Sequence, residues 1–145
     1  MNEETLFDPR GAADDLFNAR RSLEPCEPVA GKYEIDMLEQ AYTVQEELIK
    51  RFHYAGSKAV GWKLGLTDPK AQEQMALQTP LFGRLLEGWR YDNGAAIPTD
   101  QLISPRVEGE LAFFFTAAIT DPEIDESALL ANIGKVMPAL EICDS

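Results

Sequence analysis

Hydrophobic residues recur at helical spacing in two stretches of the first 57 residues. Over residues 10–23, Leu16 and Phe17 fall on one side of a predicted helix. A longer helix is predicted to begin at a capping box formed by Asp36 and Glu39. The residues that follow at helical spacing are Ile35, Leu38, Tyr42, Gln45, Leu48, Ile49 and Phe52. The segment EPCEPVAGKY between the two helices predicts a linker, because prolines and a glycine interrupt regular structure.

After residue 57 the pattern changes to the alternation that is typical of strands. Val60, Trp62 and Leu64 alternate with small or polar residues, which predicts a strand. Further strands are expected at RVEGELAFFF (106–115) and VMPALEICDS (136–145), with a helix in DPEIDESALLANIGK between them. The chain is therefore expected to be α+β, with an N-terminal helical region at 1–57 and a β-rich part at 58–145.

The predicted strand RVEGELAFFF places two acidic residues inside an apolar run. Because side chains alternate between the faces of a strand, Glu108 and Glu110 share one face, with Cα atoms about 6.6 Å apart. One interpretation is an exposed edge strand, where charges prevent aggregation. The other is a site for a hard cation such as Mg²⁺, with Glu141 of a neighbouring strand as the third carboxylate.

Lys63 is the second candidate for chemistry. Gly61 and Gly65 lie on its own face of the predicted strand, and neighbours without side chains leave room for a ligand. A lysine in that position can bind a carboxylate or transfer a proton. The alternative is an ordinary lysine on a solvated face.

Composition and charge narrow the classes of partner. The chain has 145 residues, a formal net charge of −12 and a pI near 4.4, which argues against binding to nucleic acid or to an anionic membrane surface. The N-terminus has no apolar signal segment, and no apolar run reaches the roughly 20 residues of a membrane span. Cys26 and Cys143 have no CxxC spacing. We therefore expect a cytoplasmic protein with reduced thiols.

Four motifs occur in one order: GWKLGLTDPKAQEQM, TPLFGRL, ISPRVEGELAFFF and VMPALEICDS. Together they resemble the 2-keto-4-pentenoate hydratase and 4-oxalocrotonate decarboxylase family of the fumarylacetoacetate hydrolase superfamily. The resemblance runs from about residue 35 to the last residue. It implies a mixed β-roll, of which this chain is expected to carry only the first strands, as a truncated N-terminal half.

The resemblance also implies a site. Glu108, Glu110 and Glu141 are expected to bind Mg²⁺ or Mn²⁺, and Lys63 to handle the substrate, a small 2-oxo or 2-hydroxy acid. The expected activity is hydration of 2-hydroxypenta-2,4-dienoate-type dienols in the catabolism of aromatic compounds. Leu81 replaces an acid that many hydratases carry, which favours the alternative, a 4-oxalocrotonate-type decarboxylase. The implied partners are further copies of the chain or a hydratase–decarboxylase complex, in which a truncated chain could also serve as an inactive subunit.

Overall fold

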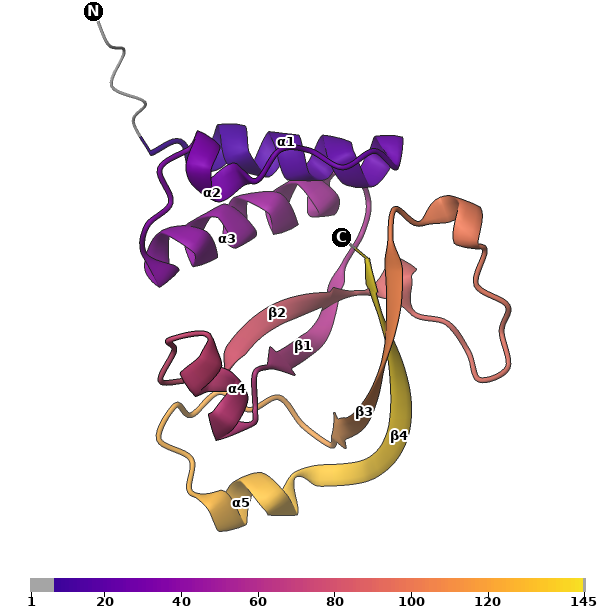
Figure 1. The fold of residues 1–145 in the computed structure, drawn as a ribbon. Coiled ribbons are helices and arrows are strands. Elements are labelled where there is room, and N and C mark those ends of the chain that lie inside the picture. The colour runs from indigo at the N-terminus through magenta and orange to yellow at the C-terminus, as the bar shows by residue number, and fades with distance from the viewer. Residues whose placement is uncertain (1–6, 145) are drawn as a thin grey trace, which may run out of the picture. The chain divides into compact units, whose positions relative to one another are not determined.

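The computed structural model describes residues 7–144, which divide into two compact units between Gln101 and Leu102 (Figure 1). The first unit contains helices and a two-stranded sheet, and the second contains a second two-stranded sheet and a short helix. The prediction of a mixed fold is confirmed, with both sheets antiparallel. The predicted division at residues 57 and 58 stays a prediction. No helix among residues 7–144 is long and apolar enough to cross a bilayer.

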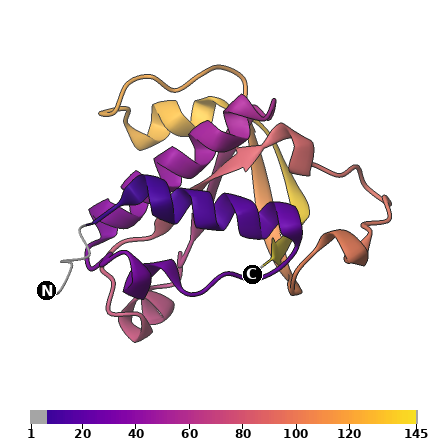
Figure 2. The ribbon, with the colours of Figure 1, turned by 90° about the horizontal axis from the view of Figure 1, so that it is seen from above.

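Helices α1 (Pro9–Ser22) and α3 (Leu38–Tyr54) pack side by side in the first unit (Figure 2). The carboxylate of Asp8 caps α1 by accepting hydrogen bonds from the backbone N–H groups of Arg10 and Gly11. Small side chains allow the helices to approach, because Ala12 and Ala13 are buried with Val44 of α3. The predicted helix over 10–23 is thus confirmed within one residue at each end.

Two details of the predicted helical region were wrong. The segment between the helices is not wholly a linker, because it contains a one-turn helix, α2 (Val29–Lys32). The predicted capping box of Asp36 and Glu39 does not form. Instead, Gln40 Oε1 accepts hydrogen bonds from the backbone N–H groups of Asp36 and Met37, and α3 begins one residue later. An amide oxygen satisfies the same backbone donors as the predicted carboxylate.

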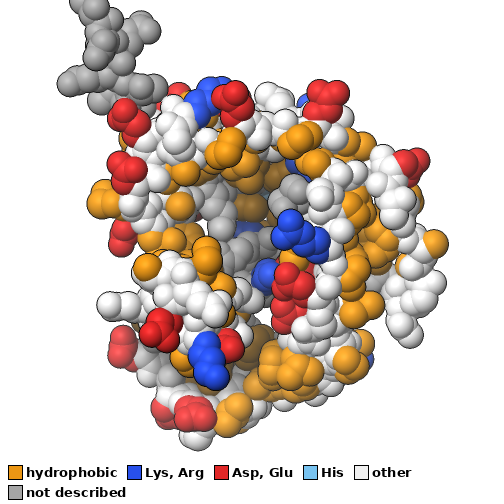
Figure 3. Space-filling model, viewed as in Figure 1, with side chains coloured by type: hydrophobic (Ala, Val, Ile, Leu, Met, Phe, Trp, Pro, Cys, Tyr) orange, Lys and Arg blue, Asp and Glu red, His pale blue; other side chains and the backbone are white. Residues whose placement is uncertain are grey.

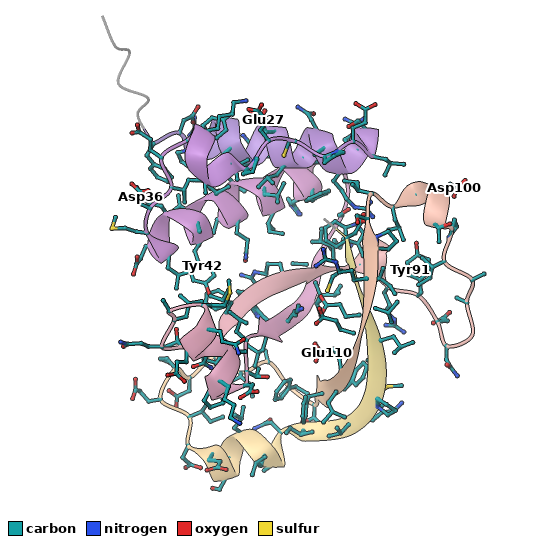
Figure 4. All side chains as sticks on the ribbon, in the orientation of Figure 1. Glu27, Asp36, Tyr42, Tyr91, Asp100 and Glu110 are labelled. Atoms are coloured by element: carbon teal, nitrogen blue, oxygen red, sulfur yellow. The ribbon has the colours of Figure 1, made fainter. Side chains whose placement is uncertain are left out.

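The sheet of the first unit pairs β1 (Ala59–Gly65) with β2 (Leu81–Leu86). Helix α4 (Pro69–Gln74) lies between them in sequence, and the 3₁₀ turns η1 (Glu87–Trp89) and η2 (Thr99–Gln101) follow β2. Tyr42 of α3, labelled in Figure 4, stacks on the Phe82 ring of β2 with centroids 4.2 Å apart. Its hydroxyl accepts from the Phe82 N–H, and Gln45 donates to the Phe82 carbonyl. Helix α3 therefore satisfies backbone groups that β2 would otherwise leave unpaired.

The second unit is built on a long hairpin-like pair, β3 (Pro105–Phe115) and β4 (Ile133–Asp144). Helix α5 (Glu126–Ala131) lies in the connection, and it is shorter than predicted because Asp125 caps its N-terminus by accepting from the Ala128 N–H. The register of the two strands is regular from Pro105 to Phe114.

The regular register gives the β3–β4 sheet one apolar and one polar face. The apolar face carries Val107, Leu111 and Phe113 of β3 opposite Ile142, Pro138 and Val136 of β4, with Leu140 opposite Gly109. Most of these side chains are exposed, including Val107 at 64% and Leu140 at 74%, and hydrophobic side chains are visible over the hairpin in Figure 3. A two-stranded sheet with one open apolar face is marginally stable in water by itself.

An acid-sensitive contact joins α1 to α2. Asp15 Oδ2 accepts hydrogen bonds from Lys32 Nζ at 2.7 Å and from the Tyr33 hydroxyl at 2.9 Å. The bond from Lys32, followed by that from Tyr33, lowers the pKa of Asp15 below 3.8. Because the folded-state pKa is the lower one, this contact stabilises the fold above pH 3.8 and is lost as the pH falls below it.

We therefore expect Asp15→Asn to destabilise the chain at pH 6 and to have a smaller effect at pH 3. The measurement is urea unfolding of both proteins at the two pH values. Asp36→Asn, at an exposed position on the other side of α2 in sequence, is the matched control. An equal loss of stability for Asp15→Asn at both pH values would show that the Asp15 charge does not act through this contact.

Candidate metal centre

The polar face of the β3–β4 sheet brings two of the predicted carboxylates together. Glu108 lies directly opposite Glu141 in the register. Ligand atoms of these two residues and of Cys143 all lie within 4.8 Å of one another. Two ligands that bind one ion at about 2.0–2.6 Å lie at most about 5 Å apart, so this spacing suits a shared cation.

Glu110, the third predicted ligand, is placed differently. Glu110 lies on β3 (Figure 4), two residues beyond Glu108 on the same face. In the register it lies opposite Ala139 rather than opposite a second acid. It is not part of the close group of Glu108, Glu141 and Cys143. Glu108 and Glu110 are exposed, whereas Glu141 is half-buried.

The paired carboxylates place two oxygen donors side by side, where one cation could bind both. Like charges directly opposite each other on a sheet are destabilising unless a neighbouring group of opposite charge compensates them. The remaining charged residue on this part of the face is Arg106, which lies opposite Cys143. The arrangement therefore combines two carboxylate donors with the spacing of a coordination site, and carboxylate donors are those that Mg²⁺ and Ca²⁺ prefer.

Lys63 belongs to the first unit, on β1. Its neighbours on its own face of the strand are Gly61 and Gly65, as predicted, and Gly83 lies directly opposite it on β2. A Cβ atom added at Gly65 would have no atom within 4 Å, and one at Gly83 would only touch Gln45 at 4.0 Å. The half-buried Lys63 thus has no side chain from the positions next to it or directly opposite it on this face, which leaves room for a ligand beside it.

Leu81 shares this face with Lys63. It lies opposite Gly65, one pair along from the Lys63–Gly83 pair, so the two side chains are diagonal neighbours. Sequence analysis singled out both positions, but it did not place them on one face. Gly83 was missed altogether, because only the register of β2 shows that it lies opposite the lysine.

Comparisons by sequence and by structure both match this chain to hydratases and decarboxylases that act on small unsaturated acids. The chain is 31% identical over 144 residues to a 2-hydroxypent-2,4-dienoate hydratase of Pseudomonas putida, covering 99% of this chain and 64% of that protein. It is 32% identical over 133 residues to a 4-oxalocrotonate decarboxylase of Pseudomonas sp. (strain CF600), covering 92% and 50%. This chain is a relative of the 2-keto-4-pentenoate hydratases and 4-oxalocrotonate decarboxylases. No protein-family model matches it.

Solved structures of this hydratase–decarboxylase group agree with the fold. The chain superposes on the 4-oxalocrotonate decarboxylase from Pseudomonas putida G7 with a TM-score of 0.87 and 28% identity, over 94% of this chain and 53% of that one. That decarboxylase was solved in complexes with calcium and acetate and with magnesium and adipate. The chain spans about half to two thirds of the length of the relatives that it matches.

Proposed function

We propose that the chain carries the metal-binding part of a divalent-metal-dependent lyase that adds water to 2-hydroxydienoates. The observation that carries this proposal is the Glu108–Glu141 pair, which lies on the polar face of a sheet in a chain similar to a magnesium-binding decarboxylase. The relatives named as hydratases of 2-hydroxypent-2,4-dienoate and 2-hydroxyhexa-2,4-dienoate support the substrate class. Decarboxylation of a 4-oxalocrotonate-type acid is the second candidate, supported by the decarboxylase relatives.

The donor set fits a hard divalent cation. Glu108 and Glu141 would hold Mg²⁺ or Mn²⁺ from opposite strands, and Glu110 would be the third carboxylate from the same face. When bound, the cation acts as a Lewis acid that polarises the 2-oxygen of the substrate and makes its neighbouring carbons easier to deprotonate or hydrate. Alternation along β3 puts Glu108 and Glu110 on one face, and the register of β3 with β4 places Glu141 on that same face.

We assign Lys63 to the substrate. Its ammonium group can bind the carboxylate of a small 2-hydroxy or 2-oxo acid, and its Nζ can hold or release a proton during the reaction. The glycines around it leave the space that a planar, conjugated acid needs. Residues 58–145 would form the first part of a fumarylacetoacetate-hydrolase-like mixed β-roll, and residues 1–57 its helical N-terminal region. We also propose that the chain assembles with copies of itself or in a hydratase–decarboxylase complex, which the exposed apolar face of β3–β4 supports.

Leu81 provides a test of hydration against decarboxylation. Its aliphatic side chain cannot transfer a proton, and it is a diagonal neighbour of Lys63. We expect Leu81→Asp to raise the ratio of hydrated product to released CO₂ by about tenfold or more, because a positioned acid contributes on the order of 10²–10⁴-fold to a proton transfer. Both products are measured from the same reaction. Leu64→Asp, at an exposed position on the opposite face of β1, is the control, and an unchanged ratio for Leu81→Asp would remove this position from the account.

A further inference from the structure

The polar face of β3–β4 offers two different third donors to the same pair of carboxylates. The Glu108–Glu141 pair lies in the middle of the row. Two residues along in one direction is Glu110, opposite Ala139, and two residues along in the other is Cys143, opposite Arg106. A cation held by the central pair is therefore flanked by a carboxylate on one side and by a thiol on the other.

The thiol is the donor that the geometry already brings into range. The sulfur of Cys143 lies within 4.8 Å of the ligand oxygens of both Glu108 and Glu141, and the residue is half-buried at the same end of β4. Thiolate ligands favour Zn²⁺, Co²⁺ and Cd²⁺, whereas Mg²⁺ and Mn²⁺ prefer oxygen ligands. The two flanking donors thus differ in the metals that they suit.

We propose that Cys143 is a metal ligand of this centre, which binds thiophilic divalent cations through Glu108, Glu141 and Cys143 and binds Mg²⁺ or Mn²⁺ through the three carboxylates. On coordination the thiol releases its proton to solvent, so that the thiolate is the ligand. Zinc-class cations then compete with Mg²⁺ for the central pair. The inference rests on the proposed metal centre, and it adds a ligand and a class of competing metal.

The test is a titration of the full chain with Co²⁺, followed in the near ultraviolet, where a thiolate–Co²⁺ bond gives an intense charge-transfer band. We expect the band in the unaltered chain and in Cys26→Ser, which removes the other thiol of the sequence, and no band in Cys143→Ser. Cys143→Ser should lower the Co²⁺ affinity by more than about a hundredfold. Loss of a residue that only hydrogen-bonds to a metal ligand lowers metal affinity by about 10–100-fold, and loss of a ligand itself should lower it further. Mn²⁺ affinity of that variant should be unchanged.

Glu110→Gln should behave in the opposite way, with weaker Mn²⁺ binding and an undiminished charge-transfer band. A second measurement does not depend on a variant: Zn²⁺ or Cd²⁺ should protect Cys143 from alkylation, and Mg²⁺ should not. Co²⁺ binding without the band, or alkylation at the same rate with and without Zn²⁺, would overturn the role of Cys143 and leave the carboxylate site intact. Failure of the chain to bind Mn²⁺ as well as Co²⁺ would instead overturn the proposed metal centre.

Discussion

Glu108→Gln is expected to weaken Mn²⁺ binding by at least about a hundredfold, the largest effect that we expect from a single change at the metal centre. Glu108 is the residue that lies opposite Glu141 and next to Glu110, so it belongs to every ligand set that the face can form. Glutamine keeps the shape of the side chain but removes the negative charge that attracts a hard cation. Mn²⁺ binding is measured by calorimetry or by the loss of the free Mn²⁺ signal in electron paramagnetic resonance.

The same change separates loss of metal binding from loss of folding. Without metal, Glu108→Gln should leave the stability of the chain nearly unchanged, because Glu108 is exposed and glutamine keeps the shape of its side chain. Glu123→Gln, an exposed position in the connection between β3 and α5, is the matched control and should leave Mn²⁺ affinity unchanged. Unchanged Mn²⁺ affinity in Glu108→Gln would contradict the assignment of the metal to this face.

Lys63→Met is expected to lower kcat on a 2-hydroxydienoate by about 10²–10⁴-fold while leaving Mn²⁺ affinity unchanged. Methionine keeps most of the length of the side chain but cannot bind a carboxylate or carry a proton. Because Lys63 has glycines on both sides and directly opposite, no neighbouring residue of its face replaces its ammonium group. The two measurements are the turnover of the dienoate and a Mn²⁺ titration of the same preparation.

Lys58→Met is the control for this prediction, since Lys58 is an exposed lysine immediately before β1. It should keep the activity of the unaltered chain. If Lys63→Met and Lys58→Met retained equal activity, Lys63 would be an ordinary surface lysine, which is the alternative that its sequence position left open. A parallel loss of Mn²⁺ binding in Lys63→Met would assign its effect to the structure rather than to the substrate.

The sequence predicted the elements that depend on local periodicity. The helix over 10–23 and the strand around Lys63 were confirmed nearly to the residue, because their apolar positions repeat with one clear period. Alternation along 106–115 also placed Glu108 and Glu110 on one face correctly. The residue that caps α3 was predicted wrongly. Gln40, rather than Glu39, accepts from the backbone N–H groups at the start of the helix, and the sequence did not distinguish them because both residue types can accept from these donors.

Which residues meet at the candidate site depends on the register of the paired strands, and a sequence does not show that register. Alternation fixes which face a residue occupies, but the partner across the strand pair depends on how two distant segments align. For that reason the direct opposition of Glu108 and Glu141 was only a hypothesis before the structure, and the approach of Cys143 and of Gly83 was not foreseen. Cys143 had been interpreted only as a reduced thiol, because Cys26 and Cys143 have no CxxC spacing.

The most direct test of the proposed lyase is to follow the ultraviolet absorbance of 2-hydroxypent-2,4-dienoate with the chain present, first with Mg²⁺ and then with an excess of a chelator. Hydration removes the conjugated dienol, so the account predicts that the absorbance falls in the presence of Mg²⁺ and that the fall stops when the chelator is added. A decrease that the chelator does not change, or no decrease beyond that of the buffer, would contradict a metal-dependent hydratase.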